Sequence, residues 1–262
     1  MAIVFLIGGT GNQLFQYAAA APKDRFSTVF LKPAVRRVFK FTDHPTIFRF
    51  PRANLLLEMM AVLVLGLDLV ASKLARRTLF TELDLRSAKY QPRLACLVRA
   101  GYFQTAPMVR DVAELTTSLP SPDPAFAART CIHIRGGDLL HERDLENPVY
   151  GVLPVDYYRE ALARVAPDGG PVHVFTDDLD HARSICDEID PSMQVTLDNG
   201  ALHEMFINAT HASVFVGSNS TLSYWILQLR GDQGGSVAPK PFQNRRDMPF
   251  GADVTRLPVC YT

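Results

Sequence analysis

The chain has 262 residues, of which 47% are apolar and 21% are charged, and its 27 basic residues balance its 27 acidic ones. This composition is typical of a globular protein, and it excludes a disordered chain, a collagen-like chain, a disulfide-rich miniprotein and a polytopic membrane protein. The four cysteines form no Cys-x-x-Cys pair. Neither a zinc knuckle nor a redox motif is therefore predicted, and a reducing cytoplasm fits best.

The net charge of zero hides an asymmetry between two halves of the chain. Residues 1–122 contain 16 Lys and Arg against 8 Asp and Glu, whereas residues 123–262 contain 11 against 19. The basic excess fits a solvated face of the protein. It fits equally well an anionic partner, either a membrane surface or a phosphate-bearing acceptor. Nucleic acid is disfavoured, because no recognisable nucleic-acid-binding module accompanies the charge.

The first predicted element is a buried strand over Ala2–Ile7, followed by the glycine-rich run Gly8–Asn12 and a helix that starts near Gln13. A glycine turn between a strand and a helix presents backbone N–H groups and a positive helix end to a phosphate. The run lacks the third glycine of the dinucleotide fingerprint, because Leu14 takes its place. A tight turn without a ligand is the alternative interpretation.

Residues 53–71 form an apolar segment long enough to cross a bilayer, with basic residues on both sides. We expect a mostly buried helix, and a helix lying in the membrane interface is the second interpretation. A span is least favoured, because Glu58 and Asp68 would each cost about 2.5–3.5 kcal/mol near the bilayer centre. The N-terminus has no signal-peptide pattern. A cytoplasmic location is therefore expected, with a peripheral contact on the inner membrane face as an option.

Residues 106–117 are predicted to be helical, and residues 119–124 hold three prolines, which is typical of a linker. We therefore predict two domains, 1–122 and 123–262. In the second, strands alternate with helices: strands over 129–134, 172–175, 195–197 and 214–216, and helices over 155–166, 179–189 and 202–212. This alternation predicts an α/β fold with parallel sheets, which bind ligands at the carboxyl ends of their strands.

The motif His133-Ile134-Arg135-Gly136-Gly137-Asp138 follows the first strand of the second half. His133 and Arg135 lie two residues apart on a strand, so their side chains point the same way. The two glycines allow a close approach of the backbone to a ligand, and the guanidinium offers a planar fork that matches a diphosphate. An Arg–Asp ion pair that closes a turn is the alternative.

Two further runs follow apolar strands. In Phe175–Asp180, the pair Asp178 and Asp180 could bind a metal, but the pattern is short and common. Asp177 or Asp178 could instead cap the next helix, or accept hydrogen bonds from a nucleotide base or ribose. The run Gly217–Ser223 places four hydroxyl residues before a helix, which suits a second phosphate contact or an ordinary helix cap.

These residues resemble the α-1,2-fucosyltransferases of glycosyltransferase family 11. That family has an element Gly-Gly-x-Gly-Asn-Gln-(Leu/Met)-Phe-Gln-Tyr-Ala, which Gly8–Ala18 matches almost completely. Further elements similar to those of the family are Gly101–Gln104, His133–Asp138, Phe175–Asp178, Asn219–Trp225 and Ala238–Lys240. Gly136 stands where the family has a second arginine, and Leu222 and Tyr224 replace an aromatic Phe and Trp.

The resemblance implies a GT-B-type architecture of two Rossmann-like halves that face a cleft. The N-terminal half would bind the acceptor and contribute the Gly-Asn-Gln loop, and the C-terminal half would bind the donor. The implied reaction is an inverting, metal-independent transfer of L-fucose from GDP-fucose to the 2-hydroxyl of a galactoside in a cell-surface glycan. No cofactor and no metal are expected.

Without a metal, fixed cations and N–H donors must hold the charge that develops on the β-phosphate, and Arg135 is the first candidate. Asp138 is the candidate general base, and Glu142 is the second choice. The other donor-binding candidates are Gly9, Gly11, Asn12, His133, Asp178, Asn219, Ser220 and Thr221, and the acceptor-binding candidates are Gln13, Tyr102, Gln104 and Glu142.

Two alternative functions stay open. One is a transferase of the same fold that uses another deoxysugar nucleotide. The other is a non-catalytic protein that binds a sugar nucleotide, because Gly136 removes a cation next to the diphosphate. In each case the expected partner is a nucleotide sugar, joined by a glycan acceptor when the protein is an enzyme.

Overall fold

The division of the chain lies at its proline-rich segment. The computed structural model describes residues 2–28, 46–51, 53–75, 81–84, 98–104, 108, 110–142, 151–231, 234–243, 247–250 and 253–261. The chain separates into two units, Met1–Leu119 and Pro120–Thr262. The sequence placed this division after residue 122, within the same segment.

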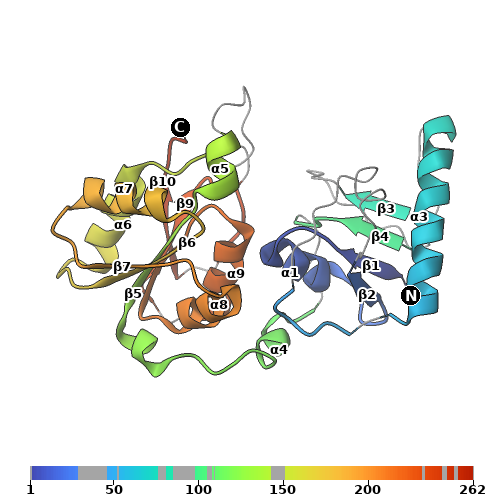
Figure 1. Cartoon of the computed structure of the whole chain (residues 1–262), viewed down its shortest axis with the longest axis horizontal. Helices are drawn as coiled ribbons and strands as arrows, with labels where there is room; N and C mark the ends of the chain where they lie inside the picture. Colours follow the sequence, from blue (N-terminus) through green and yellow to red (C-terminus); the bar gives the residue numbers. More distant parts are fainter. Residues whose placement is uncertain are drawn as a thin grey trace. The chain divides into compact units, whose positions relative to one another are not determined.

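The N-terminal unit contains a parallel sheet with the strand order β2-β1-β4-β3. Its elements are β1 (Ile3–Leu6), α1 (Thr10–Ala19), β2 (Arg25–Thr28), α3 (Leu55–Ala75), β3 (Thr81–Asp84), β4 (Val98–Gly101) and α4 (Ala113–Thr116). Alternate residues of a strand point to opposite faces of its sheet. Phe5 and Ile7 therefore pack against Ala61 and Leu65 of α3, while α1 lies on the other side of β1 (Figure 1).

Two predicted helices have different bounds in the structure. The first begins at Thr10 rather than near Gln13, because the carbonyl of Gly9 already accepts the N–H groups of Asn12 and Gln13. Of the helix predicted over 106–117, the described part is helical only over α4. Arg110 lies before α4, and its guanidinium donates to carbonyls of the segment after α1.

The prediction of a mostly buried helix over 53–71 is wrong for α3. Ala61 and Leu65 are buried, but the opposite side of the helix exposes large apolar side chains such as Leu56 and Leu63. Apart from Glu58 and Asp68 the segment is apolar on every side, so its sequence pattern did not separate a packed side from an exposed one. In the described part of the chain, no helix is both long and apolar enough to cross a bilayer.

The C-terminal unit contains a parallel sheet with the strand order β10-β9-β8-β5-β6-β7. Its strands are β5 (Thr130–Ile134), β6 (Val172–Thr176), β7 (Val195–Asp198), β8 (Val214–Val216), β9 (Ser236–Lys240) and β10 (Val254–Pro258). Its helices are η1 (Pro124–Ala128), α5 (Gly137–Glu142), α6 (Val155–Val165), α7 (Leu179–Ile189), α8 (Leu202–His211) and α9 (Thr221–Arg230). The strands predicted over 129–134, 172–175, 195–197 and 214–216 are confirmed, because each observed bound lies within one residue of the predicted one.

Helices cover both faces of this second sheet (Figure 1). Ile132 and Ile134 of β5 pack in a core with Tyr158 of α6 and Ile185 of α7. The residues between them face the other way, so the ring of His133 reaches α9. Two parallel-sheet units confirm the predicted α/β class with two Rossmann-like halves. The cleft between the halves stays a prediction.

Candidate functional site

The candidate site of the C-terminal unit lies where β5, β6 and β7 end. Ile134 pairs with Thr176, and Phe175 pairs with Asp198, so the three strands end side by side. The residues that follow are therefore neighbours, although they lie far apart in the sequence. The Nε of Arg135 is 2.6 Å from the Oδ2 of Asp177. This ion pair places the guanidinium beside Asp177 at the carboxyl edge of the sheet.

Asp177 also shapes the turn that follows β5. Its Oδ1 accepts the N–H of Gly136 at 2.8 Å, so one carboxylate holds both the arginine and the backbone next to it. Gly137 has a φ of +34°, and a Cβ at this position would lie 2.7 Å from Oδ2 of Asp177. Glycine is therefore required for the backbone to approach the carboxylate this closely.

His133 is a buried, neutral side chain on the same side of β5 as Arg135. Its Nδ1 lies 2.7 Å from the Oγ of Ser223, and this Oγ already accepts the N–H of Ser218. Burial, and then the nearby charge of Arg135, lowers the pKa of His133 from 6.5 to about 3. If the Ser223 hydroxyl donates to Nδ1, the proton of His133 sits on Nε2, where it can serve as a neutral donor.

Gly136 has a close neighbour in the helix α7. A Cβ at position 136 would lie 2.7 Å from the Cβ of Asp178 and 3.1 Å from Cδ2 of His181. A side chain at this position would therefore start toward the first turn of α7. In this conformation, the turn approaches that helix too closely for a Cβ at position 136.

A cavity of about 190 Å³ opens at these strand ends. Its walls come from the ends of three strands and from two helices: His133, Arg135, Thr176, Asp177, Asp198, Asn199, Gly200, Leu202, Met205 and Leu222. Ligand sites usually measure about 300–1,000 Å³, so this cavity has room for a part of a nucleotide sugar. It combines one cation, two carboxylates and an amide with an apolar wall.

Several side chains predicted to bind the donor instead cap helices or form hydrogen bonds to the backbone. Asp178 accepts the N–H of His181 at the start of α7, and Ser220 accepts the N–H of Ser223 at the start of α9. The amide of Asn219 is buried and donates to the carbonyl of Gly151. None of these residues lines the cavity, and neither does Thr221. For Asp178 and Ser220, the sequence had named a helix cap as the alternative.

The two candidate bases lie on the short helix α5. Asp138 and Glu142 occupy its first and last turns. Their side chains lie outside the described part of the structure, and their role as bases stays a prediction.

Polar residues of the N-terminal unit gather at the carboxyl ends of β1 and β4. The two strands are parallel neighbours, so Gly8–Asn12 and Gly101–Gln104 meet although about 90 residues separate them. The Nε2 of Gln104 donates to Oδ1 of Asn12 at 2.9 Å. Gly8 has a φ of +74°, and a Cβ there would lie 2.9 Å from the ring of Tyr102. Gly9 is the N-cap of α1, and no side chain caps this helix end.

Two glutamines close this first turn from within. Gln16 is fully buried; its Oε1 accepts the N–H of Ile7, and its Nε2 donates to the carbonyls of Ile7 and Gly101. Gln13 is also buried, and its Nε2 donates to the carbonyl of Gly8. The sequence assigned Gln13 to the acceptor and gave Gln16 no role. The pattern Gln-x-x-Gln on one helix face was the signal for a shared structural role.

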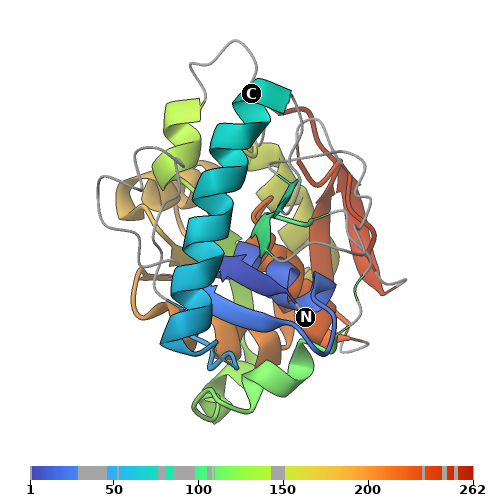
Figure 2. The same cartoon turned by 90° about the vertical axis from the view of Figure 1, so that its right-hand side faces the viewer.

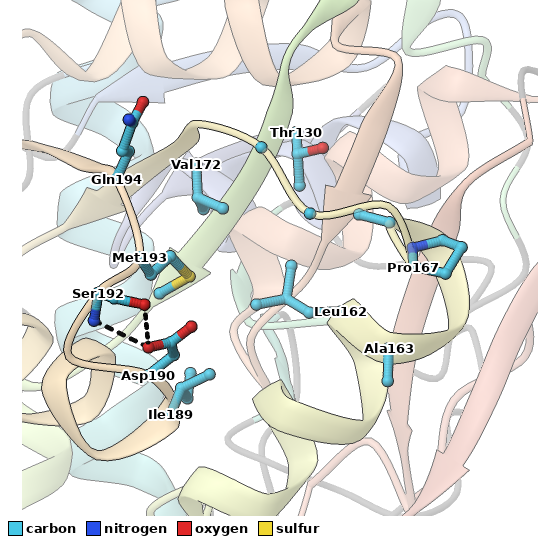
Figure 3. A pocket seen from close by; sticks show the side chains of 13 residues that line it. Thr130, Leu162, Ala163, Pro167, Val172, Ile189, Asp190, Ser192, Met193 and Gln194 are labelled. Carbon is cyan, nitrogen blue, oxygen red and sulfur yellow. Dashed lines mark hydrogen bonds between the residues drawn. The ribbon is translucent and has the colours of Figure 1, made fainter.

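A larger hollow of about 440 Å³ lies at the opposite edge of the second sheet (Figure 3). It is lined by Thr130 and Val172, which begin their strands, and by the ends of α6 and α7. The carboxylate of Asp190 there binds the N–H and the hydroxyl of Ser192. The lining contains no cation for a phosphate, and ligands of parallel sheets bind at the carboxyl edge. The smaller cavity is therefore the candidate ligand site of this unit.

The Asp-x-Asp pair has separate surroundings in the structure. Asp178 caps α7, while Asp180 is exposed in the first turn of that helix. Among the described residues, no three His, Cys, Asp or Glu side chains gather as a metal site would require.

Several solved glycosyltransferases are found in a structural comparison with the chain. It is similar to the E. coli heptosyltransferase WaaC with ADP, at 14% identity and a TM-score of 0.45, over 98% of this chain and 92% of that one. A glycosyl transferase of family 9 from Veillonella parvula has 11% identity and a TM-score of 0.40, over 98% and 85%. POFUT1 in complex with GDP has 13% identity and a TM-score of 0.39, over 89% and 96%.

No protein among the curated sequences matches the chain. A family model described as glycosyl transferase family 11 matches residues 125–255, which is half of the chain. The matched range includes His133, Arg135 and Asp177, and with them the whole lining of the smaller cavity. The chain therefore belongs to glycosyl transferase family 11.

Proposed function

We propose that this protein transfers L-fucose from GDP-fucose to the 2-hydroxyl of a galactoside in a cell-surface glycan, with inversion and without a metal or cofactor. The family supports a glycosyltransferase of the fucosyltransferase type. The observation that carries the proposal is the guanidinium of Arg135, which lines the cavity and is paired with Asp177. It is a cation placed where a parallel sheet receives a phosphate.

Arg135 is proposed to stabilise the leaving group. As the bond from fucose to the β-phosphate breaks, negative charge grows on the phosphate and the sugar becomes oxocarbenium-like. A guanidinium has five N–H donors, more than one carboxylate can use, so Asp177 and a phosphate can share it. Because the ion pair with Asp177 already holds the arginine at the cavity wall, the arginine needs little reorganisation when the charge develops.

His133 is proposed to contact the nucleotide as a neutral donor. Its low pKa, about 3, keeps the ring uncharged at neutral pH. Arg135 is therefore the cation that we assign to the phosphates in this cavity. Asn199 lies exposed at the cavity rim, and its amide suits the hydrogen-bonding groups of a ribose or base. The amino end of α1, at Gly9 and Gly11, is proposed as a further phosphate contact.

The acceptor hydroxyl requires a base in a single displacement. Asp138 is proposed for this role, with Glu142 as the second choice. Tyr102 and Gln104 are proposed to contact the acceptor, since both are half-buried at the edge of the first sheet. A direct contact is less favoured for Gln13, whose amide is buried and donates to the carbonyl of Gly8.

The non-catalytic alternative rested on the missing arginine at position 136. The Cβ position of residue 136 faces Asp178 and His181, and Gly136 does not line the cavity. A side chain there would begin at α7 and not at the proposed phosphate position. This favours a working transferase over a protein that only binds the nucleotide.

The test is a donor assay with the full chain. GDP-fucose and other deoxysugar nucleotides are each incubated with a panel of galactosides, with and without EDTA. We expect transfer from GDP-fucose that survives EDTA. A strict need for Mn²⁺ or Mg²⁺ would contradict the metal-free mechanism and revive the Asp178–Asp180 pair. Thermal stabilisation by GDP without any transfer would favour the binding protein, and transfer from a different sugar nucleotide would identify the alternative enzyme.

A further inference from the structure

Helix α3 presents an apolar outer face to solvent. Six of the eight exposed large hydrophobic residues in the described part of the chain lie on this helix, with exposed fractions of 53–72%. They are Leu55, Leu56, Met59, Met60, Leu63 and Leu67. We call these residues the α3 outer face. Figure 2 shows α3 from outside the N-terminal unit, with β1 behind it.

The α3 outer face is one continuous surface. At 100° per residue, its six members fall within an arc of about 140° around the helix axis. The charged residue of this stretch, Glu58, is half-buried and lies outside that arc. On the opposite side, Ala61 and Leu65 are buried against the first sheet. The helix therefore has two apolar sides, of which the fold uses one.

Such a surface is unusual for a soluble protein. Single exposed apolar residues are common, but a contiguous exposed patch usually marks a site of interaction with a protein or a membrane. The face is a convex ridge made by one helix. A ridge of this kind fits a planar interface, where amphipathic helices bury their apolar side to about 5–10 Å. Half the diameter of a helix is about the same distance, so the outer half can insert while the inner half stays packed.

The net positive charge of the N-terminal unit favours an anionic membrane as the partner of this face. Residues 1–119 contain 16 basic and 8 acidic residues, and Lys23, Arg25 and Arg49 are exposed. Basic residues next to an inserted apolar face are attracted to anionic lipid headgroups. The same net positive charge opposes contact between the N-terminal units of two copies, because like charges repel.

We propose that the α3 outer face is a membrane-docking surface that inserts into the interface of an anionic lipid bilayer. This inference goes beyond the proposed function and does not depend on the donor or the acceptor. The helix lies parallel to the membrane, and the N-terminal unit is held by apolar insertion and by its positive charge.

The test is co-sedimentation of the full chain with vesicles. Vesicles of phosphatidylcholine alone are compared with vesicles that contain about 30% phosphatidylserine, at low and high salt. The double variant Leu56→Gln/Leu63→Gln removes two exposed side chains from the α3 outer face. The control variant Leu179→Gln changes an exposed leucine of the other unit, which is 40% exposed. Circular dichroism and light scattering check the fold and the oligomeric state of each protein.

We expect the wild type and Leu179→Gln to bind the anionic vesicles, with weaker binding at high salt. The double variant should keep its Tm and lose about tenfold or more in partition coefficient. The proposal is overturned if the wild type stays in the supernatant, or if the folded double variant binds as well as the wild type. Equal binding to neutral vesicles overturns the choice of an anionic surface. A dimer that the double variant dissociates would identify a protein interface instead.

Discussion

The chain contains two strand–glycine turn–helix segments that differ in what their polar side chains do. In the turn between β1 and α1, the buried Gln16 makes three hydrogen bonds to backbone groups of Ile7 and Gly101. In the turn between β5 and α5, Arg135 and its partner Asp177 line a cavity. In the first turn the buried side chain bonds to the backbone, whereas in the second turn the charged side chain of Arg135 faces a cavity.

The comparison shows that the motif most specific to the family is not the one whose side chains are suited to bind a ligand. The run Gly-Asn-Gln-Leu-Phe-Gln-Tyr is the most specific pattern in the sequence, yet its two glutamines are buried and bond to the main chain. The shorter run around Arg135 holds the group suited to a phosphate. Changes of the two glutamines should therefore act mainly on stability, and a change of Arg135 mainly on turnover.

Replacing Arg135 by Ala should have the largest effect. Loss of one donor to a developing charge typically costs about 3–4 kcal/mol, or 10²–10³-fold in rate. The ion pair with Asp177 is partly exposed, so the Tm should change little. Lysine should rescue poorly, because it lacks the planar fork. The measurement is kcat with GDP-fucose, with the surface variant Arg159→Ala as control. Wild-type turnover in Arg135→Ala would show that the phosphate site lies elsewhere.

Replacing Gln16 by Met should act on stability. The side-chain volume is nearly kept, but the N–H of Ile7 and the carbonyls of Ile7 and Gly101 lose a partner. Each unsatisfied buried group costs about 1–3 kcal/mol, and we expect a total loss of about 3 kcal/mol in urea unfolding. The exposed Gln194→Met is the control. If the folded variant loses turnover at unchanged stability, the contrast between the two turns fails.

Replacing Gly136 by Ala should strain the second turn. The added Cβ would lie 2.7 Å from Cβ of Asp178, and the shift needed to relieve this contact should cost about 1–3 kcal/mol. Gly9→Ala is the matched control in the first turn, because a Cβ there meets nothing within 4 Å and its φ is −64°. Thermal unfolding compares the two. An equal Tm for both variants would mean that the turn after β5 relieves the contact with Asp178 at little cost in stability, and would contradict the prediction.

The pH dependence of stability should report the burial of His133. Its folded-state pKa, about 3, lies below the ordinary 6.5, so the unfolded chain takes up the proton first. The stabilising contribution is therefore fully present above pH 6.5 and is lost as the pH falls toward 3, at about 1.4 kcal/mol per pH unit. Urea unfolding at pH 7 and pH 5 should show a smaller difference for His133→Asn than for the wild type. A difference that persists unchanged in His133→Asn would assign the slope to other groups, and His211→Asn is the control.

The strand and helix pattern of the second half was predictable because each buried strand is a short apolar run that ends in a turn signal. The pairing of His133 and Arg135 on one face followed from the alternation of side chains along β5. The exposed side of α3 was not predictable, because apolar residues occupy both the covered and the exposed side of this helix.

The rest of the cavity depends on the order of the strands. Asp198 ends β7 and Asn199 follows it. They line the cavity together with Arg135 because β6 lies between β5 and β7 in the sheet. A single sequence does not specify that order. The sequence also did not distinguish the roles of Asp177 and Asp178, because the two carboxylates are adjacent. In the structure, Asp177 pairs with Arg135 and Asp178 caps α7.

The bridge from Gln16 to Gly101 also constrains how the chain can fold during synthesis. The amide of Gln16 donates to a carbonyl 85 residues further along the chain. The hydrogen bond between Gln104 and Asn12 likewise forms only after Gln104 has been synthesised. At a translation rate of about 5–20 residues per second, the ribosome adds this intervening length in about 4–17 s. Until then β1 lacks its β4 neighbour, and the amide of Gln16 lacks one of its two acceptors. The nascent N-terminal unit should therefore remain a substrate for chaperones until β4 has left the exit tunnel.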